Sequence, residues 1–531
     1  MKALSRVGEG FHVVRAREPL LESPGQARFG RPPERATDCP NVLTNVDMSF
    51  IRWIESVHRR TDGGGHRMIG ATELLSVQTT LPEPAFDLHY LHYPLDVPAG
   101  TTELELVLEY DKIVDVVQIY AVLLEPDGTF RGHVQCPGGP GPRRLVIRVG
   151  TAGASPGCVP GPIPPGRWTV RLDLDRHKAA APYELTVSAA SAATASAATR
   201  VDPGAGAGTI GGPGWYRGEL HSHSTHSDGR RPVADLVKAA KEAGLDFLAV
   251  TDHFTAAHWQ DLDGHDDIVL LRSMELTSHR GHANLHGLTR WVDTYVDRPE
   301  HTMVHVAGDV HEQGGLVCVN HAFSGDQAWR RFDTPWDRID LMEIAHLQQG
   351  ANNDAQIGLW DRLLTAGHRV IGVAGSDCHD PADPGQALGQ VVTVVHAEEA
   401  GERGIVEALR RGRVRVWRGA DMDMHVNGVP MGATAAAPDG RVQVEVDVCA
   451  DGPVVVFVLR DGLLINVVPA ADRPGAWQRI TVEDRIATPG YYRAEIHADP
   501  GRNDPRFWAN SLRNHDSLRA AGNPVWVRPG S

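Results

Sequence analysis

The alternation of short apolar segments with an amphipathic one between residues 215 and 416 most constrains the fold of this chain. Residues 247–251, 316–320 and 370–374 are short runs of mainly apolar, often branched side chains, a composition typical of buried strands. Residues 232–243 instead place apolar side chains at helical spacing, begin with a proline and are followed by a glycine. Strands that alternate with helices predict an α/β domain built on a parallel sheet or barrel.

Both flanks of this region follow a different pattern. Residues 104–110 and 442–448 alternate polar and apolar side chains with the period of two that strands show. Turn signals such as Pro126-Asp127-Gly128 separate several short segments of this kind in the N-terminal flank. We therefore predict an antiparallel β-sandwich before the α/β domain and a second β-rich, sandwich-like domain after it.

The segment just before the α/β domain marks the clearest boundary in the chain. It is dominated by alanine, glycine, serine and proline, which bury little apolar area and are typical of linkers. Residues 1–85 carry no pattern that predicts a fold. The predicted order is an unassigned N-terminal extension (1–85), a β-sandwich domain (86–192), a linker (193–214), the α/β domain (215–416) and a C-terminal β domain (417–531).

Bulk composition restricts the class of partner. The 531-residue chain carries a net charge of −15, which disfavours nonspecific binding to nucleic acid or to anionic membranes. Apolar runs long enough for a membrane span are lacking. The N-terminus lacks the apolar stretch of a secretory signal and the six cysteines are scattered, so we expect a cytoplasmic protein with reduced thiols.

Histidine is concentrated in the first half of the α/β domain. Thirteen of the 27 histidines lie between His221 and His321, which indicates metal ligation or acid–base chemistry more than a histidine-rich loop. His221 and His223 would share one face of a strand, so both imidazoles can reach the same metal ion. Asp228 follows on a turn and can serve a neighbouring ion. Taken alone, the histidine pair is also compatible with satisfied polar strand residues.

Four later segments place metal-binding side chains at or just past the ends of predicted strands. These residues are His253, Glu275, His321, and Asp377 with His379. Active sites of βα barrels and open α/β sheets lie at the carboxyl ends of the strands. Five strand ends that each deliver His, Asp or Glu therefore predict one shared site.

These motifs resemble those of the PHP (polymerase and histidinol phosphatase) domain superfamily of metal-dependent phosphoesterases. They span about residues 215–385 and comprise His221-x-His223 with Ser227-Asp228-Gly229, Thr251-Asp252-His253, Glu275, Gly281-His282, Asn320-His321 and Asp377-x-His379. The flanking β-rich segments, including 157–168 and 522–527, resemble the subgroup named for the carbaryl hydrolase CehA and its relative McbA.

The resemblance implies a distorted seven-stranded (β/α) barrel with a centre of two or three divalent metal ions. One ion would be held by His221, His223, Glu275 and Asp377, a second by Asp228, His253 and His379, and a third by Glu275, His282 and His321. His226 lies inside the first motif and could compete with Asp228. His279 and His286 flank His282, so the ligand choice there stays open. The mixed nitrogen and oxygen donors suit Zn, Mn or Fe(II).

A centre of this kind lowers the pKa of bound water to about 7 and so supplies a nucleophile without a protein side chain. The expected activity is hydrolysis of a small-molecule phosphoester. Carbamate or carboxylic ester hydrolysis is the alternative, because metal ions also polarise carbonyls. The candidate catalytic residues are Glu275, Asp377 and His379, the last two as carriers of protons.

Two functions of other kinds compete with this one. The metal ions could only stabilise a binding module, although structural sites usually have fewer and cysteine-rich ligands. A polymerase-associated proofreading nuclease is disfavoured by the acidic charge and by the absence of a polymerase-sized extension. The β-sandwich could shape the substrate cleft or mediate a homo-oligomer, and the sequence leaves both open.

Several polar residues near the motifs have simpler explanations. Histidines without strand-end placement are expected to be exposed or to contact the ligands, and they are His258, His265, His301, His305 and His311. Asp252 can orient His253 or cap the following turn. Cys378 should point away from the metal ions if its segment is extended, which makes it a structural residue.

Overall fold

The computed structural model describes nine stretches of the chain, namely residues 71–85, 88–114, 116–135, 140–191, 211–296, 301–399, 401–470, 473–499 and 515–530. Most of the predicted N-terminal extension and of the predicted linker lie outside these residues, as do Cys39 and Cys136. None of the helices in these stretches is long and apolar enough to cross a membrane.

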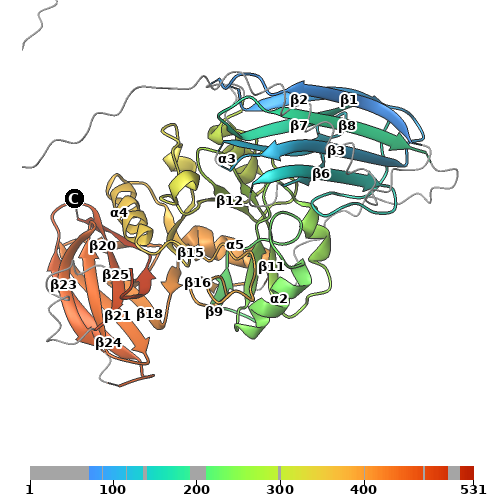
Figure 1. Ribbon diagram of the computed structural model, residues 1–531. Coiled ribbons are helices and arrows are strands. Elements are labelled where there is room, and N and C mark those ends of the chain that lie inside the picture. The colour runs from blue at the N-terminus through green and yellow to red at the C-terminus, as the bar shows by residue number, and fades with distance from the viewer. Residues whose placement is uncertain are drawn as a thin grey trace, which may run out of the picture. The chain divides into compact units, whose positions relative to one another are not determined.

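Two antiparallel four-stranded sheets form the N-terminal sandwich (Figure 1). One sheet has the order β1 (Thr72–Thr80), β8 (Pro182–Ala190), β3 (Glu103–Lys112) and β6 (Gly141–Gly150). The other has the order β2 (Tyr90–Val97), β7 (Gly166–His177), β4 (Val117–Leu124) and β5 (Phe130–Val134). The predicted alternation places Leu104, Leu106 and Leu108 of β3 in the core. The sandwich is thus confirmed, and it includes β1 from the segment without a predicted fold.

A run of eight strands forms the central α/β domain. Its order is β15 (Ile371–Gly375), β14 (Leu341–His346), β13 (Leu316–Val319), β12 (Ala283–His286), β11 (Val269–Leu276), β10 (Phe247–Val250), β9 (Gly214–Glu219) and β16 (Val392–Ala397). Strands β9 to β11 and β13 to β15 are parallel, whereas β12 and β16 run antiparallel to their neighbours. The Thr393 hydroxyl of β16 bonds the N–H and the carbonyl of Ala374 in β15, at 2.8 and 3.0 Å. These bonds join the two ends of the run into the expected distorted barrel, with β16 added to its seven strands.

Four helices pack against the barrel strands β10, β13, β14 and β16. In the same order they are α2 (Val233–Glu242), α3 (Met303–Glu312), α4 (Asn352–Thr365) and α5 (Glu402–Arg411). Helix α2 buries Val233, Leu236 and Val237 on one face, as the helical spacing predicted. It ends before Gly244, whose φ of +71° is a conformation that favours glycine.

The C-terminal domain continues the sheet of the barrel. Strand β17 (Val414–Trp417) pairs with β16 and with β26 (Leu518–Gly522), and the sheet then passes through β25 (Gly490–Ala498), β22 (Val454–Arg460) and β23 (Leu463–Ala470). From β25 it extends to β27 (Val525–Pro529) and β20 (Thr434–Ala437). A second sheet has the order β19 (Val429–Pro430), β18 (Ala420–Val426), β21 (Arg441–Ala450) and β24 (Gln478–Arg485). The predicted β-rich C-terminal domain is confirmed.

The sandwich packs on loops that follow barrel strands. The described residues from 71 to 530 belong to one compact unit. Phe254, just after β10, and Tyr295, after β12, belong to the hydrophobic core of the sandwich, and both are buried. Arg171 of β7 forms a salt bridge of 2.9 Å with Asp293. This packing fixes the sandwich beside the loops that carry several of the candidate ligands.

Candidate metal centre

All nine predicted ligand residues converge at one end of the barrel. They fall into groups in which one ligand atom per residue lies within 4.8 Å of the others. The groups are His221 with His223 and Asp377; His223 with Asp228, His253 and His379; His253 with Glu275 and His282; His221 with Glu275 and His321; and His221 with Glu343 and His346. Several residues belong to two or more groups, so the groups form one continuous set of candidate ligand side chains. We call this set of residues the metal cluster.

Glu275 lies at the centre of the metal cluster and is fully buried. The apolar run before Glu275 predicted that this residue lies just past the end of a strand. Glu275 instead lies inside β11, next to its last residue. Its Oε2 lies 2.8 Å from Nδ1 of His253 and 3.5 Å from Nε2 of His223. Its Oε1 lies 3.1 Å from Nδ1 of His282 and 3.5 Å from Nε2 of His221. Each oxygen faces its own set of imidazoles, so this carboxylate can bridge two ions.

Asp228 joins the cluster from the loop after β9. Its Oδ1 lies 3.3 Å from Nε2 of His379 and 3.5 Å from Nε2 of His253. Gly229 lets this loop fold back on the start of the first motif, because a Cβ at Gly229 would lie 2.1 Å from the carbonyl oxygen of His223. The glycine that ends the first motif is therefore needed for Asp228 to reach the cluster.

Several buried atoms of the metal cluster lack a hydrogen bond. Among the described residues, Nε2 of His221, both ring nitrogens of His223 and Oε2 of Glu275 make no hydrogen bond of acceptable geometry. Other candidate ligand atoms nevertheless lie close to them, as Nδ1 of His253 does to Oε2 of Glu275 at 2.8 Å. A buried polar atom without a partner costs about 1–3 kcal/mol, so several of them side by side need compensation. Divalent cations fit this donor set, because imidazole nitrogens and carboxylate oxygens together suit Zn, Mn or Fe(II).

Two imidazoles are oriented so that Nε2 is the ligand atom. Nδ1 of His221 lies 2.7 Å from Oε1 of Glu343, and Nδ1 of His379 lies 2.9 Å from the Asp377 carbonyl oxygen. A proton on Nδ1, donated to these oxygens, leaves Nε2 free to bind a cation. Glu343 also accepts a hydrogen bond of 2.7 Å from the backbone N–H of His321. One carboxylate therefore fixes two ligand residues.

Glu343 and His346 were not predicted as site residues, and both lie in β14. This strand carries the same signal as the others, because it is a short buried apolar run that holds an acid and ends on a histidine. Nε2 of His346 lies 3.9 Å from Oε2 of Glu343 and 3.9 Å from Oδ2 of Asp377. Gly375 of β15 makes room for the carboxylate, because a Cβ there would lie 2.1 Å from Oε1 of Glu343.

Two ligand residues have a backbone conformation that L-residues rarely adopt. The φ angle is +22° at His321 and +55° at Asp377. Such conformations cost about 1–3 kcal/mol and persist where the surrounding structure enforces them, often at functional sites. Here the buried strands β13 and β15 end two residues before His321 and Asp377, which both belong to the cluster.

Asp252 has a role that the sequence analysis did not consider. Its carboxylate accepts a hydrogen bond of 2.7 Å from the Ser224 N–H and one of 2.6 Å from the Ser227 hydroxyl. These bonds fix the loop between β9 and α2, which carries Asp228. Asp252 therefore positions the candidate ligand Asp228 by fixing the loop that carries it.

The three histidines that left the ligand choice open lie outside the ligand groups of the described residues. Nδ1 of His226 accepts a hydrogen bond of 3.1 Å from the backbone N–H of Gly157 in the sandwich, so this ring does not compete with Asp228. Nδ1 of His286 lies 2.9 Å from the hydroxyl of Ser273. The ring of His279 stacks on His89 of the sandwich. Cys378 is buried in the apolar core of the barrel domain, as expected for a structural residue.

The imidazoles and carboxylates of the cluster shift one another's pKa values. Burial lowers the pKa of His379, but Asp377 and Asp228 outweigh burial and raise that pKa to about 10. Burial also opposes a proton on His253, whose pKa Glu275 and Asp228 nevertheless raise to about 9. Burial raises the pKa of Glu275, and neighbouring imidazoles lower it well below its usual range. Without metal ions, His253 and His379 are therefore protonated near neutral pH, and the carboxylate of Glu275 is ionised.

Binding of a divalent ion to chelator-treated protein is expected to release protons, because an imidazole must be neutral to bind a metal ion. Near pH 7, below a pKa of about 9 for His253 and about 10 for His379, each of these two residues should lose a proton. Release should decline once the pH exceeds both pKa values. Calorimetric titration with Mn²⁺ in buffers of different ionisation enthalpy measures the number of protons. No release near neutral pH would contradict the assignment of these imidazoles as ligands.

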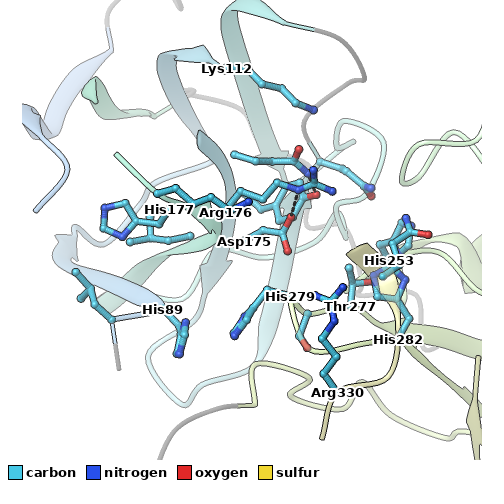
Figure 2. A pocket seen from close by; sticks show the side chains of 18 of the residues that line it. His89, Lys112, Asp175, Arg176, His177, His253, Thr277, His279, His282 and Arg330 are labelled. Carbon is cyan, nitrogen blue, oxygen red and sulfur yellow. Dashed lines mark hydrogen bonds and ion pairs between the residues drawn. The ribbon is translucent and has the colours of Figure 1, made fainter. Parts of the chain in front are cut away.

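The metal cluster opens into a cleft of about 760 Å³ between the barrel and the sandwich. Asp228, His253 and His282 line the cleft from the barrel, and Gln135 of the sandwich donates a hydrogen bond of 2.9 Å to Asp228. Figure 2 shows His253 and His282 on one side and side chains of the sandwich on the other. The volume falls in the range of roughly 300–1,000 Å³ that is typical of small-molecule pockets. A small substrate can therefore reach part of the cluster.

The fold and the cluster define an α/β barrel with buried groups of His, Asp and Glu at one end, compatible with a site for more than one metal ion. Residues 219–302 match the family model of the PHP domain, and residues 368–414 match the model described as PHP-associated. These parts of the chain are therefore similar to a PHP domain, as their motifs indicated. A search of curated proteins found no match.

Three solved structures match parts of the chain. A two-domain protein from Bacteroides vulgatus, described as containing a predicted PHP-like metal-dependent phosphoesterase, is 15% identical with a TM-score of 0.34, and the match covers 61% of this chain and 97% of that chain. PsfC from Pseudomonas syringae is 16% identical with a TM-score of 0.30, over 37% and 89%. An amidohydrolase from Chromobacterium violaceum with bound sulfate is 16% identical with a TM-score of 0.24, over 31% and 88%.

Proposed function

We propose that the chain is a metal-dependent hydrolase that cleaves a small-molecule phosphoester with two or three divalent ions. The observation that carries this proposal is the position of Glu275, whose two oxygens face separate sets of imidazoles within one cluster. Ions that share a carboxylate lie close together, and closely spaced ions suit the attacking and leaving oxygens of phosphoryl transfer. The candidate ions are Zn, Mn and Fe(II).

The positions of the site residues suggest different roles in binding the substrate and in proton transfer. When bound, the ions supply an activated water and positive charge for the leaving oxygen. Asp228 and His379 are the candidate ligands with the most exposed side chains, at 30% and 28%. Asp228 also lines the cleft, so it is placed to face the substrate. We assign proton transfer to Asp377, whose Oδ1 faces the ligand imidazoles while Oδ2 lies 3.9 Å from Nε2 of His346. His379, beside the same carboxylate at 3.6 Å, is the second candidate.

Hydrolysis of a carbamate or carboxylic ester, as in the CehA and McbA subgroup, is the second candidate function. It is favoured by the flanking segments that resemble this subgroup, which form the sandwich and part of the C-terminal domain. Against it, the cleft is lined by several cationic side chains, and a neutral ester gains little from them. A purely structural metal site is disfavoured because such sites close their coordination sphere, whereas this cluster opens into a cleft.

A comparison of ester substrates tests the proposed function. The full chain, reconstituted with Mn²⁺ or Zn²⁺, is expected to hydrolyse p-nitrophenyl phosphate or bis(p-nitrophenyl) phosphate with a kcat/KM at least about tenfold above that for p-nitrophenyl acetate and an aryl N-methylcarbamate, a difference of about 1.4 kcal/mol. A chelator should remove the activity and added metal should restore it. Turnover of the carbamate or acetate alone would favour the second candidate. Metal binding without turnover of any ester would favour a binding module.

A further inference from the structure

The wall of the cleft opposite the metal cluster is cationic. Lys112, Arg176 and Lys178 of the sandwich line it. The sandwich also adds the carboxylate of Asp175, whose Oδ2 lies 3.7 Å from Nε of Arg176, so three cations face one carboxylate. Arg330 lines the cleft from the barrel. The chain as a whole carries a net charge of −15, so the charge of this wall is opposite to that of the molecule. A cationic concave wall raises the local concentration of anions.

The cationic wall belongs to ordered strands of the sandwich. Lys112 is the last residue of β3, and Arg176 lies near the end of β7. Lys112 is only 7% exposed and the side chain of Arg176 is 24% exposed, so both are partly shielded from bulk water. Figure 2 shows both side chains reaching from the sandwich into the cleft and Arg330 reaching from the other side. Partly shielded charges act more strongly on a bound anion than fully solvated ones.

Several contacts hold this wall at a fixed place relative to the metal cluster. The sandwich residue Gln135 bonds the ligand Asp228 directly, at 2.9 Å. The rings of His89 and His279 stack across the cleft with centroids 4.4 Å apart. The Thr255 hydroxyl, close to His253 in sequence, donates a hydrogen bond of 3.0 Å to the carbonyl of a sandwich glycine. The cationic wall and the candidate ligands are therefore held beside the same cleft.

We propose that the cationic wall is a second anion-binding subsite, which holds an anionic group of the substrate other than the phosphoester that reacts. The reacting phosphate lies at the metal ions, so the cations of Lys112, Arg176 and Lys178 serve a group elsewhere on the same molecule. An arginine can bind a phosphate or a carboxylate through two parallel hydrogen bonds, and a lysine adds a point charge. The substrate class is thus a small phosphoester with a second phosphate or a carboxylate. This statement rests on the proposed function for the reacting group.

Binding of non-hydrolysable phosphonates to the metal-loaded full chain tests the subsite. The probes are 1,4-butanediphosphonate and 5-phosphonopentanoate, each with two anionic groups, and butylphosphonate, with one. Calorimetry is expected to show at least about tenfold tighter binding of one or both two-anion probes than of butylphosphonate, because hydrogen bonds to charged groups are the strong ones. The better of the two probes identifies the second group as a phosphate or a carboxylate.

A double variant and a matched control test which side chains cause the tighter binding of the two-anion probes. Arg176→Gln with Lys178→Gln should remove most of the preference and change butylphosphonate affinity by less than about twofold. The control, Lys238→Gln with Arg403→Gln, removes one lysine and one arginine whose side chains are 74% and 91% exposed, and it should keep the preference. Lys112→Met tests the shielded cation separately if the double variant folds poorly.

Each outcome decides the subsite independently of the proposed function. Equal affinity of the wild type for all three probes, or an unchanged preference in the double variant and in Lys112→Met, overturns the subsite even if phosphoesters are hydrolysed. A preference that the variants remove supports the subsite even if no phosphoester is turned over, in which case only the proposed function fails.

Discussion

Replacement of Glu275 by glutamine is expected to lower the hydrolytic rate by more than about 10³-fold and to reduce the number of bound metal ions. The carboxylate faces ligand imidazoles through both oxygens, at distances of 2.8–3.5 Å. Glutamine keeps the shape of the side chain but presents an amide N–H₂ group where a ligand oxygen is needed. Charge stabilisation by metal ions contributes several kcal/mol, and each 1.4 kcal/mol corresponds to about tenfold in rate.

The measurement combines elemental analysis of dialysed protein with phosphoester turnover at saturating metal concentration. Glu402→Gln is the matched control, because Glu402 is a glutamate of the same domain that is 9% exposed and pairs with Arg272 at 2.8 Å. The control should keep its metal ions and its activity. A Glu275→Gln protein that folds, binds the full number of ions and retains more than about a tenth of the wild-type rate would contradict the central role of this carboxylate.

The barrel could be predicted because its strands are short, buried and parallel. A strand buried on both faces reads as a continuous apolar run, so each run located one strand, and β10, β13 and β15 lie within a residue or two of the predicted segments. Parallel strands deliver their carboxyl ends to one edge, which is why the polar residue after each run pointed to a common site. His253, His321 and Asp377 came together for this reason.

The contacts that complete the site could not be read from local pattern. Glu343 reaches His221 across 122 residues of sequence, and Gln135 reaches Asp228 across 93. Periodicity reports which face of an element is buried, but it does not report which distant side chain lies opposite. The antiparallel insertion of β12 between β11 and β13 was also not predicted, since four residues are too few to show a period.

Replacement of Glu343 by glutamine is the second large effect that we expect, with metal affinity and kcat/KM each about 10- to 100-fold lower. Glu343 accepts hydrogen bonds from Nδ1 of His221 and from the backbone N–H of His321, both at 2.7 Å. Glutamine has one acceptor oxygen, so its N–H₂ group must face one of these two donors. His221 would then lose its fixed orientation, or the strained backbone at His321 would lose its support.

Isothermal titration with Mn²⁺ and turnover over a range of metal concentrations separate this effect from a loss of folding. If Glu343 positions ligands, the variant should recover a large part of its rate at high metal concentration, and Glu343→Asp, which keeps two acceptor oxygens, should lie between the variant and the wild type. The buried control Glu402→Gln should change neither metal affinity nor rate. A Glu343→Gln protein with unchanged metal affinity and reduced thermal stability alone would assign this carboxylate to the core and not to the metal centre. Glu343 contacts the side chain of His221 and the backbone N–H of His321. Its replacement therefore tests whether these two predicted ligands are held as a single unit.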